Sequence, residues 1–356
     1  MIVVNARFLT QPITGVQRFA LEISRALKLL CNKDELKFFA PCNILHQEDA
    51  KNLDVEIIGS HAGHLWEQFD LPRHLKKIGS PLLLNFCNTA PVFYSNKIST
   101  LHDITYIRYP KTYSKAFRYF YRLLIPLVLK SSKHVYTVSE FSKTEISSYY
   151  RLPNQKISIV YNAVGDIFHP RSNENLKKEN YLLAVSSVKE SKNFEMIVKA
   201  FEGVSKQMKN LKLFIVGDLK SGSFSSVDLN ALTCNPQIKM LGRVSDSELV
   251  ELYSNACAFL FPSLYEGFGI PVLEAQACGC PVIASNVASM PEVLADSADL
   301  VNPHSIEDWI QAIRKIVTGE EHRNQLTGSG LRNIERFSWK KSADKILNFA
   351  IEGYKK

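Results

Sequence analysis

Short apolar runs alternate with segments of helical spacing along the first half of the chain. Apolar residues recur every three or four positions after Gly15, as at Phe19 and Ile23, which predicts an amphipathic helix. Ser139 is typical of the N-cap of another helix. The short runs are bounded by polar or turn residues and predict buried strands at residues 2–4, 82–84, 99–102, 135–138 and 157–160.

The same alternation resumes in the second half of the chain. Ser245 and Glu248 have the spacing of a capping box before a helix over residues 249–256, and another helix is predicted from Asn193. Strands alternating with helices favour parallel sheets that carry helices on both faces. The strands predicted here cover residues 181–185, 213–216, 238–241, 258–261 and 281–284.

Between Phe168 and Asn180 the chain is polar and lacks periodicity, which is typical of an interdomain linker. The length of 356 residues also exceeds the size at which one hydrophobic core stops growing. We therefore expect an α/β protein with two doubly wound, Rossmann-like domains facing a cleft. The expected parts are an N-terminal domain (1–168), a linker (169–180), a C-terminal domain (181–338) and a C-terminal helix (339–356) that packs back on the N-terminal domain.

Composition and charge narrow the function classes. No apolar run reaches the length of a bilayer-spanning helix, and the N-terminus lacks the pattern of a signal peptide. Seven scattered cysteines suit a reducing compartment, so we expect a soluble cytoplasmic protein. The net charge of +8 is compatible with nucleic acid, an anionic membrane face or phosphorylated substrates. No basic-aromatic recognition motif occurs, so nucleic acid is not expected as a partner.

The segment at residues 265–274 predicts an anion site. A strand ends at Phe261, a glycine-bearing loop follows, and a helix is expected to begin near Pro271. Backbone N–H groups and the helix dipole at such a start suit a pyrophosphate, and Gly267 and Gly269 allow close approach of a ligand. The N–H groups expected to face the ligand are those of Ile270, Val272 and Leu273.

Two carboxylates, Glu266 and Glu274, lie on either side of this helix start. Carboxylates in these positions can accept hydrogen bonds from the vicinal hydroxyls of a sugar and of a ribose. The alternative makes Glu266 a solvated loop residue and Glu274 a surface residue that complements the helix dipole.

The whole string around Glu266 and Glu274, Tyr-Glu-Gly-Phe-Gly-Ile-Pro-Val-Leu-Glu-Ala, resembles the signature of the family-4 retaining glycosyltransferases (glycosyl transferases group 1), which have the GT-B fold. Flanking segments at 242–245, 277–285 and 290–293 are also similar to family blocks. The resemblance implies that Glu266 contacts the transferred sugar and Glu274 the ribose. It also implies that the backbone from Phe268 through Gly269 to Val272 holds sugar hydroxyls and phosphates.

Lys192 precedes the first helix of the second domain, where an ammonium group can reach a phosphate or can simply be solvated. The preceding residues resemble the family block that ends in Lys-Asn, but Ser187 stands where many members carry an arginine. The resemblance therefore implies a donor phosphate on Lys192 and leaves open whether Lys189 or Arg243 replaces the arginine.

In the N-terminal half, His102 is expected at the carboxyl end of a strand. A histidine there is often structural, but the match to the family's His-Asp block implies that His102 lies beside the donor sugar. Gly15 lies in a loop similar to the family's glycine loop, which implies that its N–H meets the donor phosphate or the acceptor. Further similar blocks occur at 65–68, 88–91 and 138–143, so the resemblance runs from about residue 2 to 303.

No metal and no cofactor are expected besides the nucleotide sugar. The sequence contains no Asp-x-Asp, and Cys278 and Cys280 form an isolated pair that we interpret as small buried residues. The phosphate charge would then be offset by Lys192, backbone N–H groups and helix ends.

The resemblance implies a metal-independent hexosyltransferase that retains the anomeric configuration, with catalytic roles for His102, Glu266 and Lys192. Mannose or rhamnose donors and a polysaccharide or lipopolysaccharide product (O-antigen or capsule) are favoured by the blocks quoted above. Two alternatives stay open: a nucleotide-sugar epimerase of the same fold, which would convert donor without acceptor, and a catalytically silent sugar-nucleotide-binding module.

Residues 112–134 carry five cations, five aromatic rings and no acidic residue. Such a helix can lie on the anionic inner face of a membrane, or it can be a core helix with a solvated basic face. The first interpretation makes the protein peripheral on the inner membrane and its acceptor a lipid-linked oligosaccharide.

Overall fold

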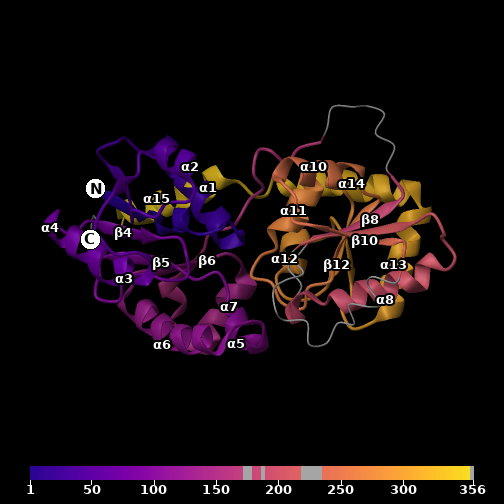
Figure 1. Cartoon of the computed structure of the whole chain (residues 1–356), viewed down its shortest axis with the longest axis horizontal. Coiled ribbons are helices and arrows are strands. Elements are labelled where there is room, and N and C mark those ends of the chain that lie inside the picture. The colour runs from indigo at the N-terminus through magenta and orange to yellow at the C-terminus, as the bar shows by residue number, and fades with distance from the viewer. Residues whose placement is uncertain (171–178, 186–188, 218–234, 353–356) are drawn as a thin grey trace. The chain divides into compact units, whose positions relative to one another are not determined.

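A computed structural model describes residues 1–170, 179–185, 189–217 and 235–352 of the chain (Figure 1). The chain divides into two compact units. The first contains Met1–Ile104, Lys115–Asn162 and Ser338–Lys356, and the second contains Thr105–Ser114 and Ala163–Phe337. Most of the linker that we expected at 169–180 lies outside the described residues.

A parallel seven-stranded sheet forms the centre of the first unit, in the order β3-β2-β1-β4-β5-β6-β7. The chain starts in the middle of the sheet, builds one half and then crosses to the other side of β1, as in a doubly wound fold. The order reverses between β1 and β4, which are hydrogen-bonded neighbours. The strands are β1 (Ile2–Asn5), β2 (Leu36–Ala40), β3 (Glu56–Ile57), β4 (Leu82–Asn85), β5 (Lys97–Thr100), β6 (His134–Thr137) and β7 (Ile157–Ile159).

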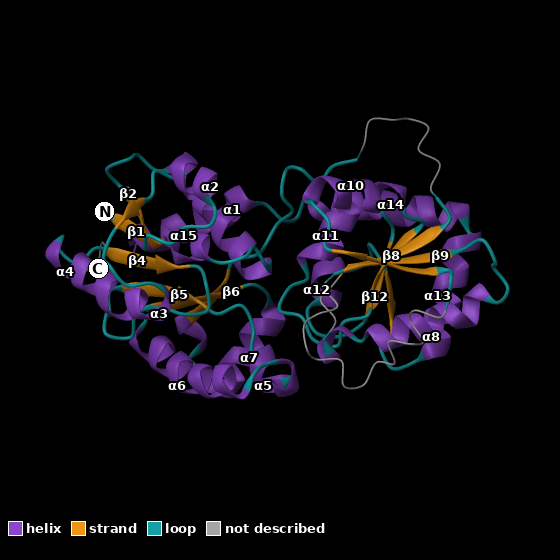
Figure 2. Ribbon diagram, in the orientation of Figure 1, coloured by secondary structure: helices purple, strands orange, loops and turns teal. Residues whose placement is uncertain are grey.

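Helices cover both faces of this sheet (Figure 2). The C-terminal helix α15 (Trp339–Glu352) packs against α1 (Gly15–Leu30), where Phe19 meets Trp339 edge to face at 5.9 Å. It therefore packs on the N-terminal unit, as expected. The other helices of this unit are α2 (Gln47–Asn52), α3 (Gly63–Leu65), a π-helical turn (Trp66–Asp70), α4 (Leu71–Lys77), α6 (Lys115–Ser131) and α7 (Glu140–Tyr150).

The second unit repeats this plan with six parallel strands in the order β10-β9-β8-β11-β12-β13, and its order reverses between β8 and β11. The strands are β8 (Tyr181–Val185), β9 (Lys212–Val216), β10 (Ile238–Gly242), β11 (Ala258–Phe261), β12 (Val282–Ser285) and β13 (Asp299–Val301). The helices are α5 (Thr105–Arg108), α8 (Phe194–Ser205), α10 (Asp246–Asn255), α11 (Ile270–Ala277), α12 (Met290–Leu294), α13 (Ile306–Thr318) and α14 (Glu320–Ile334).

Local signals in the sequence are confirmed at several helix starts. Ser245 and Glu248 form the capping box of α10, although the helix begins at Asp246 rather than at residue 249. The Ser139 side chain accepts a hydrogen bond from the N–H of Ser142 at the start of α7. The α/β fold of two doubly wound, Rossmann-like units is confirmed as well.

Candidate donor site

The strand order of the second sheet brings Lys192 and Glu266 together. Lys192 ends a short 3-10 helix (Glu190–Lys192) in the connection after β8, and Glu266 lies in the loop after β11. Because β8 and β11 are parallel neighbours, both connections leave the same edge of the sheet at the point where the strand order reverses. The N–H of Leu264 donates to the carbonyl of Ser191 at 2.8 Å and fastens the two connections to each other.

Lys192 and Glu266 form an ion pair in which Nζ donates to Oε1. Only 21% of the Lys192 side chain and 14% of the Glu266 side chain are exposed, so water screens this pair less than a surface pair. Lys192 Nζ also lies 5.8 Å from the centre of the Phe261 ring. The phosphate expected on Lys192 and the sugar expected on Glu266 would therefore bind at adjoining positions. The phosphate would also compete with the Glu266 carboxylate for the Lys192 ammonium group.

The glycine at 269 is required by the backbone and by packing. Gly269 has a φ of +95° and caps α11, and a Cβ there would lie 2.5 Å from Met290 Cε. The loop before it is held by Ser289, whose Oγ donates to the carbonyls of Glu266 and Phe268 at 3.0 Å each. The Phe268 ring is buried and meets Phe337 edge to face at 5.4 Å, so only the backbone of Phe268 is placed to meet a ligand.

One expectation about the start of α11 is wrong. The N–H of Val272 is not free, because it donates to the carbonyl of Gly269 at 3.2 Å and closes the first turn. Ile270 and Leu273 occupy the same first turn of α11, as expected, and both side chains are buried.

Glu274 is buried, with 7% of the residue exposed, which excludes the alternative of a surface residue that complements the helix dipole. Its Oε2 lies 3.5 Å from the hydroxyl oxygen of Tyr253, which donates to it from α10. Burial raises the pKa of Tyr253 well above its usual value, and the charge of Glu274 raises it further. The phenol therefore stays protonated and orients the carboxylate. Tyr253 was not among the predicted site residues, and only the structure shows that it contacts Glu274.

Ser187, which stands where many family members carry an arginine, lies outside the described residues. The two residues that could replace this arginine, Lys189 and Arg243, are both described. Lys189 shares the connection after β8 with Lys192, and its Nζ lies 5.3 Å from the centre of the Tyr113 ring. Arg243 is exposed and follows β10 at the edge of the sheet, with β9 between β10 and β8. Both alternatives stay open, and Lys189 is the one that lies on the same connection as Lys192.

In the first unit, His102 lies beyond its strand rather than at the end of it, because β5 ends at Thr100. Its Nε2–H donates to the carbonyl of Phe86 at 2.9 Å, and its ring meets Phe19 edge to face at 4.9 Å. Burial lowers the pKa of His102, against the opposing effects of the Phe86 carbonyl and the charge of Asp103. His102 is therefore a neutral imidazole whose Nδ1 is left as a hydrogen-bond acceptor.

Gly15 is the first residue of α1, after the N-cap Thr14, which forms a capping box with Gln17. Gly15 is exposed, and a Cβ there would meet no atom within 4 Å. Its N–H thus belongs to an accessible helix start, and the contact expected with a donor or acceptor stays a prediction.

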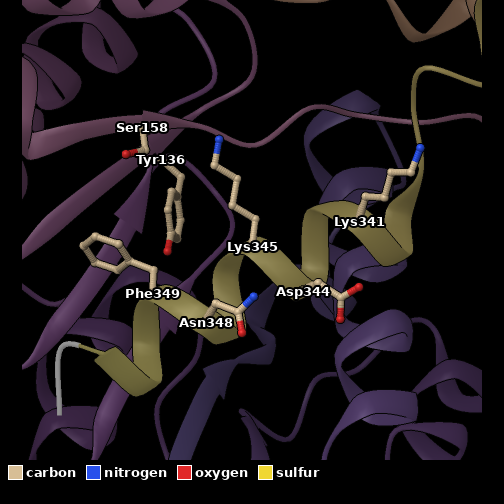
Figure 3. A pocket seen from close by; sticks show the side chains of 7 residues that line it. All are labelled: Tyr136, Ser158, Lys341, Asp344, Lys345, Asn348 and Phe349. Atoms are coloured by element: carbon tan, nitrogen blue, oxygen red, sulfur yellow. The ribbon is translucent and has the colours of Figure 1, made fainter. Parts of the chain in front are cut away.

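The hollow in Figure 3 is separate from the predicted site residues. It measures about 460 Å³ and lies between α15 and the strands β6 and β7 of the first unit (Figure 3). None of the predicted site residues lines it; the lining residues are Tyr136, Ser158, Lys341, Asp344, Lys345, Asn348 and Phe349. Within the described residues, no three His, Cys, Asp or Glu side chains gather as a metal site. No described helix is long and apolar enough to cross a membrane.

Comparison with known proteins identifies the family. The model of Glycosyltransferase Family 4 matches residues 13–166, and that of Glycosyl transferases group 1 matches residues 166–331. The two matches adjoin and span most of the chain. The chain belongs to this family of group 1 glycosyltransferases, and it is a glycosyltransferase.

Two curated relatives match over nearly their whole length. O-antigen chain mannosyltransferase B of Escherichia coli is 26% identical over 368 residues, covering 95% of this chain and 96% of the relative. O-antigen chain mannosyltransferase RfbU of Salmonella typhimurium is 29% identical over 330 residues, covering 88% of this chain and 90% of the relative.

Solved structures show the fold. WaaG, a glycosyltransferase involved in lipopolysaccharide biosynthesis, superposes with a TM-score of 0.72 at 16% identity, covering 98% of this chain and 99% of that chain. Anabaena HepE, solved with UDP and glucose, superposes with a TM-score of 0.76 at 15% identity, covering 99% of each chain. The two Rossmann-like units therefore make up the GT-B fold.

Proposed function

We propose that this glycosyltransferase moves a hexose, with mannose favoured and rhamnose second, from a nucleoside-diphosphate sugar to a lipid-linked or oligosaccharide acceptor in surface-polysaccharide assembly. The observation that carries this proposal is the grouping of Lys192, Glu266 and the buried Glu274 around the start of α11, at the switch point of the second sheet. The preference for mannose rests on the two O-antigen mannosyltransferases that the chain resembles over most of its length.

In this mechanism, Glu274 accepts hydrogen bonds from the ribose hydroxyls while Tyr253 holds its carboxylate in place. Lys192 and the positive end of α11 offset the charge of the diphosphate, so no metal is needed for that purpose. Glu266 binds the hydroxyls of the transferred sugar. The protein contributes positioning and electrostatic stabilisation of the leaving group.

The acceptor hydroxyl attacks on the face that the nucleoside diphosphate leaves, so the anomeric configuration is retained. The departing phosphate takes the proton of the acceptor hydroxyl, which balances the charges of the step without a protein base. The roles expected for His102 and Gly15 at the donor stay predictions. No bound cofactor takes part in the proposed step.

The exposed face of α6 supports a contact with an anionic membrane surface. Tyr119, Leu123 and Leu127 are 67%, 74% and 51% exposed, whereas Leu124 and Val128 of the same helix are buried against the core. The grouping of three exposed apolar side chains on one helix, together with its cations, favours a membrane surface over a core helix with a solvated basic face. The exposed cations of the helix, which complement anionic lipid headgroups, are Lys115, Arg122 and Lys130.

A thermal-shift panel of GDP, UDP, dTDP and their sugars tests the donor assignment. One nucleotide should stabilise the protein, because a ligand that binds only the folded state raises its stability. Glu274→Ala should weaken that shift, since it removes the ribose contact, whereas Glu266→Ala should keep the nucleotide shift and reduce transfer. The matched control is Glu307→Ala, an exposed glutamate in the first turn of α13 of the same unit.

The donor assignment is wrong if no nucleotide shifts the melting temperature of the wild type. The ribose assignment alone is wrong if Glu274→Ala binds the nucleotide as well as Glu307→Ala does. Product analysis by NMR then checks retention, because an inverted anomeric centre would contradict the proposed step.

A further inference from the structure

The first sheet carries a buried polar network at its own switch point, between β1 and β4. Asn5 ends β1 and Asn85 ends β4, and the Asn5 amide donates to the Asn85 side-chain oxygen at 3.0 Å across the reversal of strand order. The same amide donates to Glu67 Oε1 at 2.9 Å. Ligands of open parallel sheets bind at such a switch point, beyond the carboxyl ends of the strands.

Arg7 and Glu67 form the centre of this network. Arg7 Nε donates to Glu67 Oε1 at 3.1 Å, and only 7% and 1% of their side chains are exposed. Arg7 Nη2 donates to Thr89 Oγ1 at 2.8 Å. Burial alone would raise the pKa of Glu67, but the charge of Arg7 and the neighbouring polar side chains of His64 and Thr89 lower it to about 2. Glu67 is therefore a carboxylate at neutral pH.

A buried ion pair contributes little net stability, because desolvation of the two charges offsets their attraction. A fold that needed only stability could fill this position with apolar side chains. The second oxygen of Glu67 indicates a different purpose. Oε2 is buried and has no hydrogen-bond partner of good geometry among the described residues, and it faces His64 Nδ1 at 3.4 Å.

This arrangement orients the His64 imidazole. Its Nδ1 is buried toward the carboxylate, although 39% of the side chain is exposed. A carboxylate beside Nδ1 favours the tautomer that carries the proton on Nδ1. The other nitrogen, Nε2, then presents a lone pair that can accept a hydrogen bond from a ligand hydroxyl.

An aromatic surface adjoins the imidazole. The Phe120 ring lies 4.8 Å from the His64 ring, and 40% of Phe120 is exposed. Binding sites for small molecules commonly combine such an apolar surface with a few oriented polar groups. A sugar fits both parts, because its C–H face is apolar and its edge carries hydroxyls.

We propose that His64 is an acceptor-binding residue whose Nε2 accepts a hydrogen bond from a hydroxyl of the acceptor sugar, with the sugar face on Phe120. Glu67 and Arg7 are positioning residues that act through His64. This inference rests on the proposed function, since it names how the acceptor of that reaction is held.

A second histidine of the same segment is a matched control. His61 Nδ1 lies 2.9 Å from Asp70 Oδ1, and half of the His61 side chain is exposed. Asp70 Oδ2 accepts from the backbone N–H groups of Ser60 and His61 at 2.9 Å, so the Asp70 carboxylate fastens the loop before α3 through bonds that do not involve the His61 ring. His61 and Asp70 are thus a histidine–carboxylate pair outside the buried network.

The experiment measures steady-state transfer from GDP-mannose to mannobiose by the full chain. His64→Ala should raise the KM for mannobiose about tenfold, which corresponds to the loss of one hydrogen bond of ~1.4 kcal/mol. His64→Gln, whose amide oxygen can accept the same bond, should recover part of the loss. His61→Ala should behave as the wild type, and the thermal shift by GDP should be equal in all variants.

Glu67→Gln should also raise the KM for mannobiose. Combining it with His64→Ala should add nothing to the effect of His64→Ala alone, because both changes remove the same contact. Additive losses would instead show that Glu67 has only a structural role.

The outcomes separate the two proposals. The acceptor assignment is overturned, while the donor assignment stands, if His64→Ala leaves the KM for mannobiose unchanged. The same conclusion follows if the wild type binds GDP but does not transfer mannose to mannobiose. A GDP shift that falls together with mannobiose affinity in His64→Ala also overturns the acceptor assignment, since the variant then disturbs the fold. A wild type that no nucleotide shifts overturns the proposed function itself.

Discussion

Glu67→Gln tests the buried network through the stability of the protein. Glutamine keeps the shape of the side chain and can still accept from Arg7 and Asn5, but it removes the negative charge. The Arg7 guanidinium then stays buried without its counterion. We expect the variant to fold with a lower free energy of unfolding of the first unit.

The pKa of Glu67 sets the size of this effect. Its fall from 4.5 to about 2 in the folded state corresponds to ~3 kcal/mol at neutral pH, at 1.36 kcal/mol per unit. A second estimate, which does not use the pKa, agrees: removing one partner of a buried ion pair generally lowers the free energy of unfolding by about 3–5 kcal/mol. Because the folded pKa is depressed, the contribution is present above pH 4.5 and is lost as the pH falls toward 2. The difference between wild type and Glu67→Gln should therefore shrink to about 1.4 kcal/mol at pH 3.

Urea unfolding of both proteins at pH 7, 5 and 3, followed by tryptophan fluorescence, measures this difference. Trp66 and Trp339 report on the first unit, and Trp309 reports on the second. Glu48→Gln, which changes an exposed glutamate of α2, is the control and should match the wild type. Adding Arg7→Met to Glu67→Gln should restore much of the loss, because the unpaired buried charge is then removed.

The reasoning fails if the wild type and Glu67→Gln differ by less than about 1 kcal/mol at pH 7, since a charged pair at this burial cannot be that weak when one partner is removed. It also fails if the difference stays constant between pH 7 and pH 3. The pKa of Glu67 would then be the same in the folded and unfolded protein, contrary to its contact with Arg7.

Two further predictions concern α11 and α6. Gly269→Ala should lower the melting temperature of the second unit by roughly 5 °C, because a side chain at φ +95° is strained and its Cβ would clash with Met290. Gly15→Ala, where the space is open, should leave it nearly unchanged; equal melting temperatures in the two variants, read by scanning calorimetry, would contradict the packing argument. Leu123→Asp on α6 should abolish cosedimentation with phosphatidylglycerol vesicles, whereas Leu29→Asp, which changes an 88% exposed leucine of α1, should not. Cosedimentation of Leu123→Asp at the wild-type level would rule out the membrane contact.

Most of the fold prediction rested on local signals, namely helix caps and short apolar patterns. The helix starts at Ser139 and Ser245 were predictable because capping depends on residues within one turn. Strands β2, β3 and β13 were not predicted. Strand β3 has only two residues, both exposed, so its hydrogen bonds to β2 define it rather than an apolar pattern of its own.

The anion site at residues 265–274 was predictable for a similar reason. The loop, the proline near the start of α11 and the two glutamates lie close together along the chain, so one helix start accounts for them. The hydrogen bond from the Val272 N–H to the Gly269 carbonyl could not be predicted, because it depends on how the first turn of α11 closes. The burial of Glu274 was not readable either, since it depends on Tyr253 from a different helix.

The sequence by itself determined that two α/β units are present and that one helix start near Glu266 suits a nucleotide sugar, because periodicity, caps and the glycine loop act over a few residues. Only the tertiary structure decided which distant residues meet. Lys192 pairs with Glu266 because β8 and β11 are neighbours, and Arg7 reaches Glu67 where β1 and β4 adjoin. Strand order places these side chains at one sheet edge, and strand order is set by the packing of the whole unit.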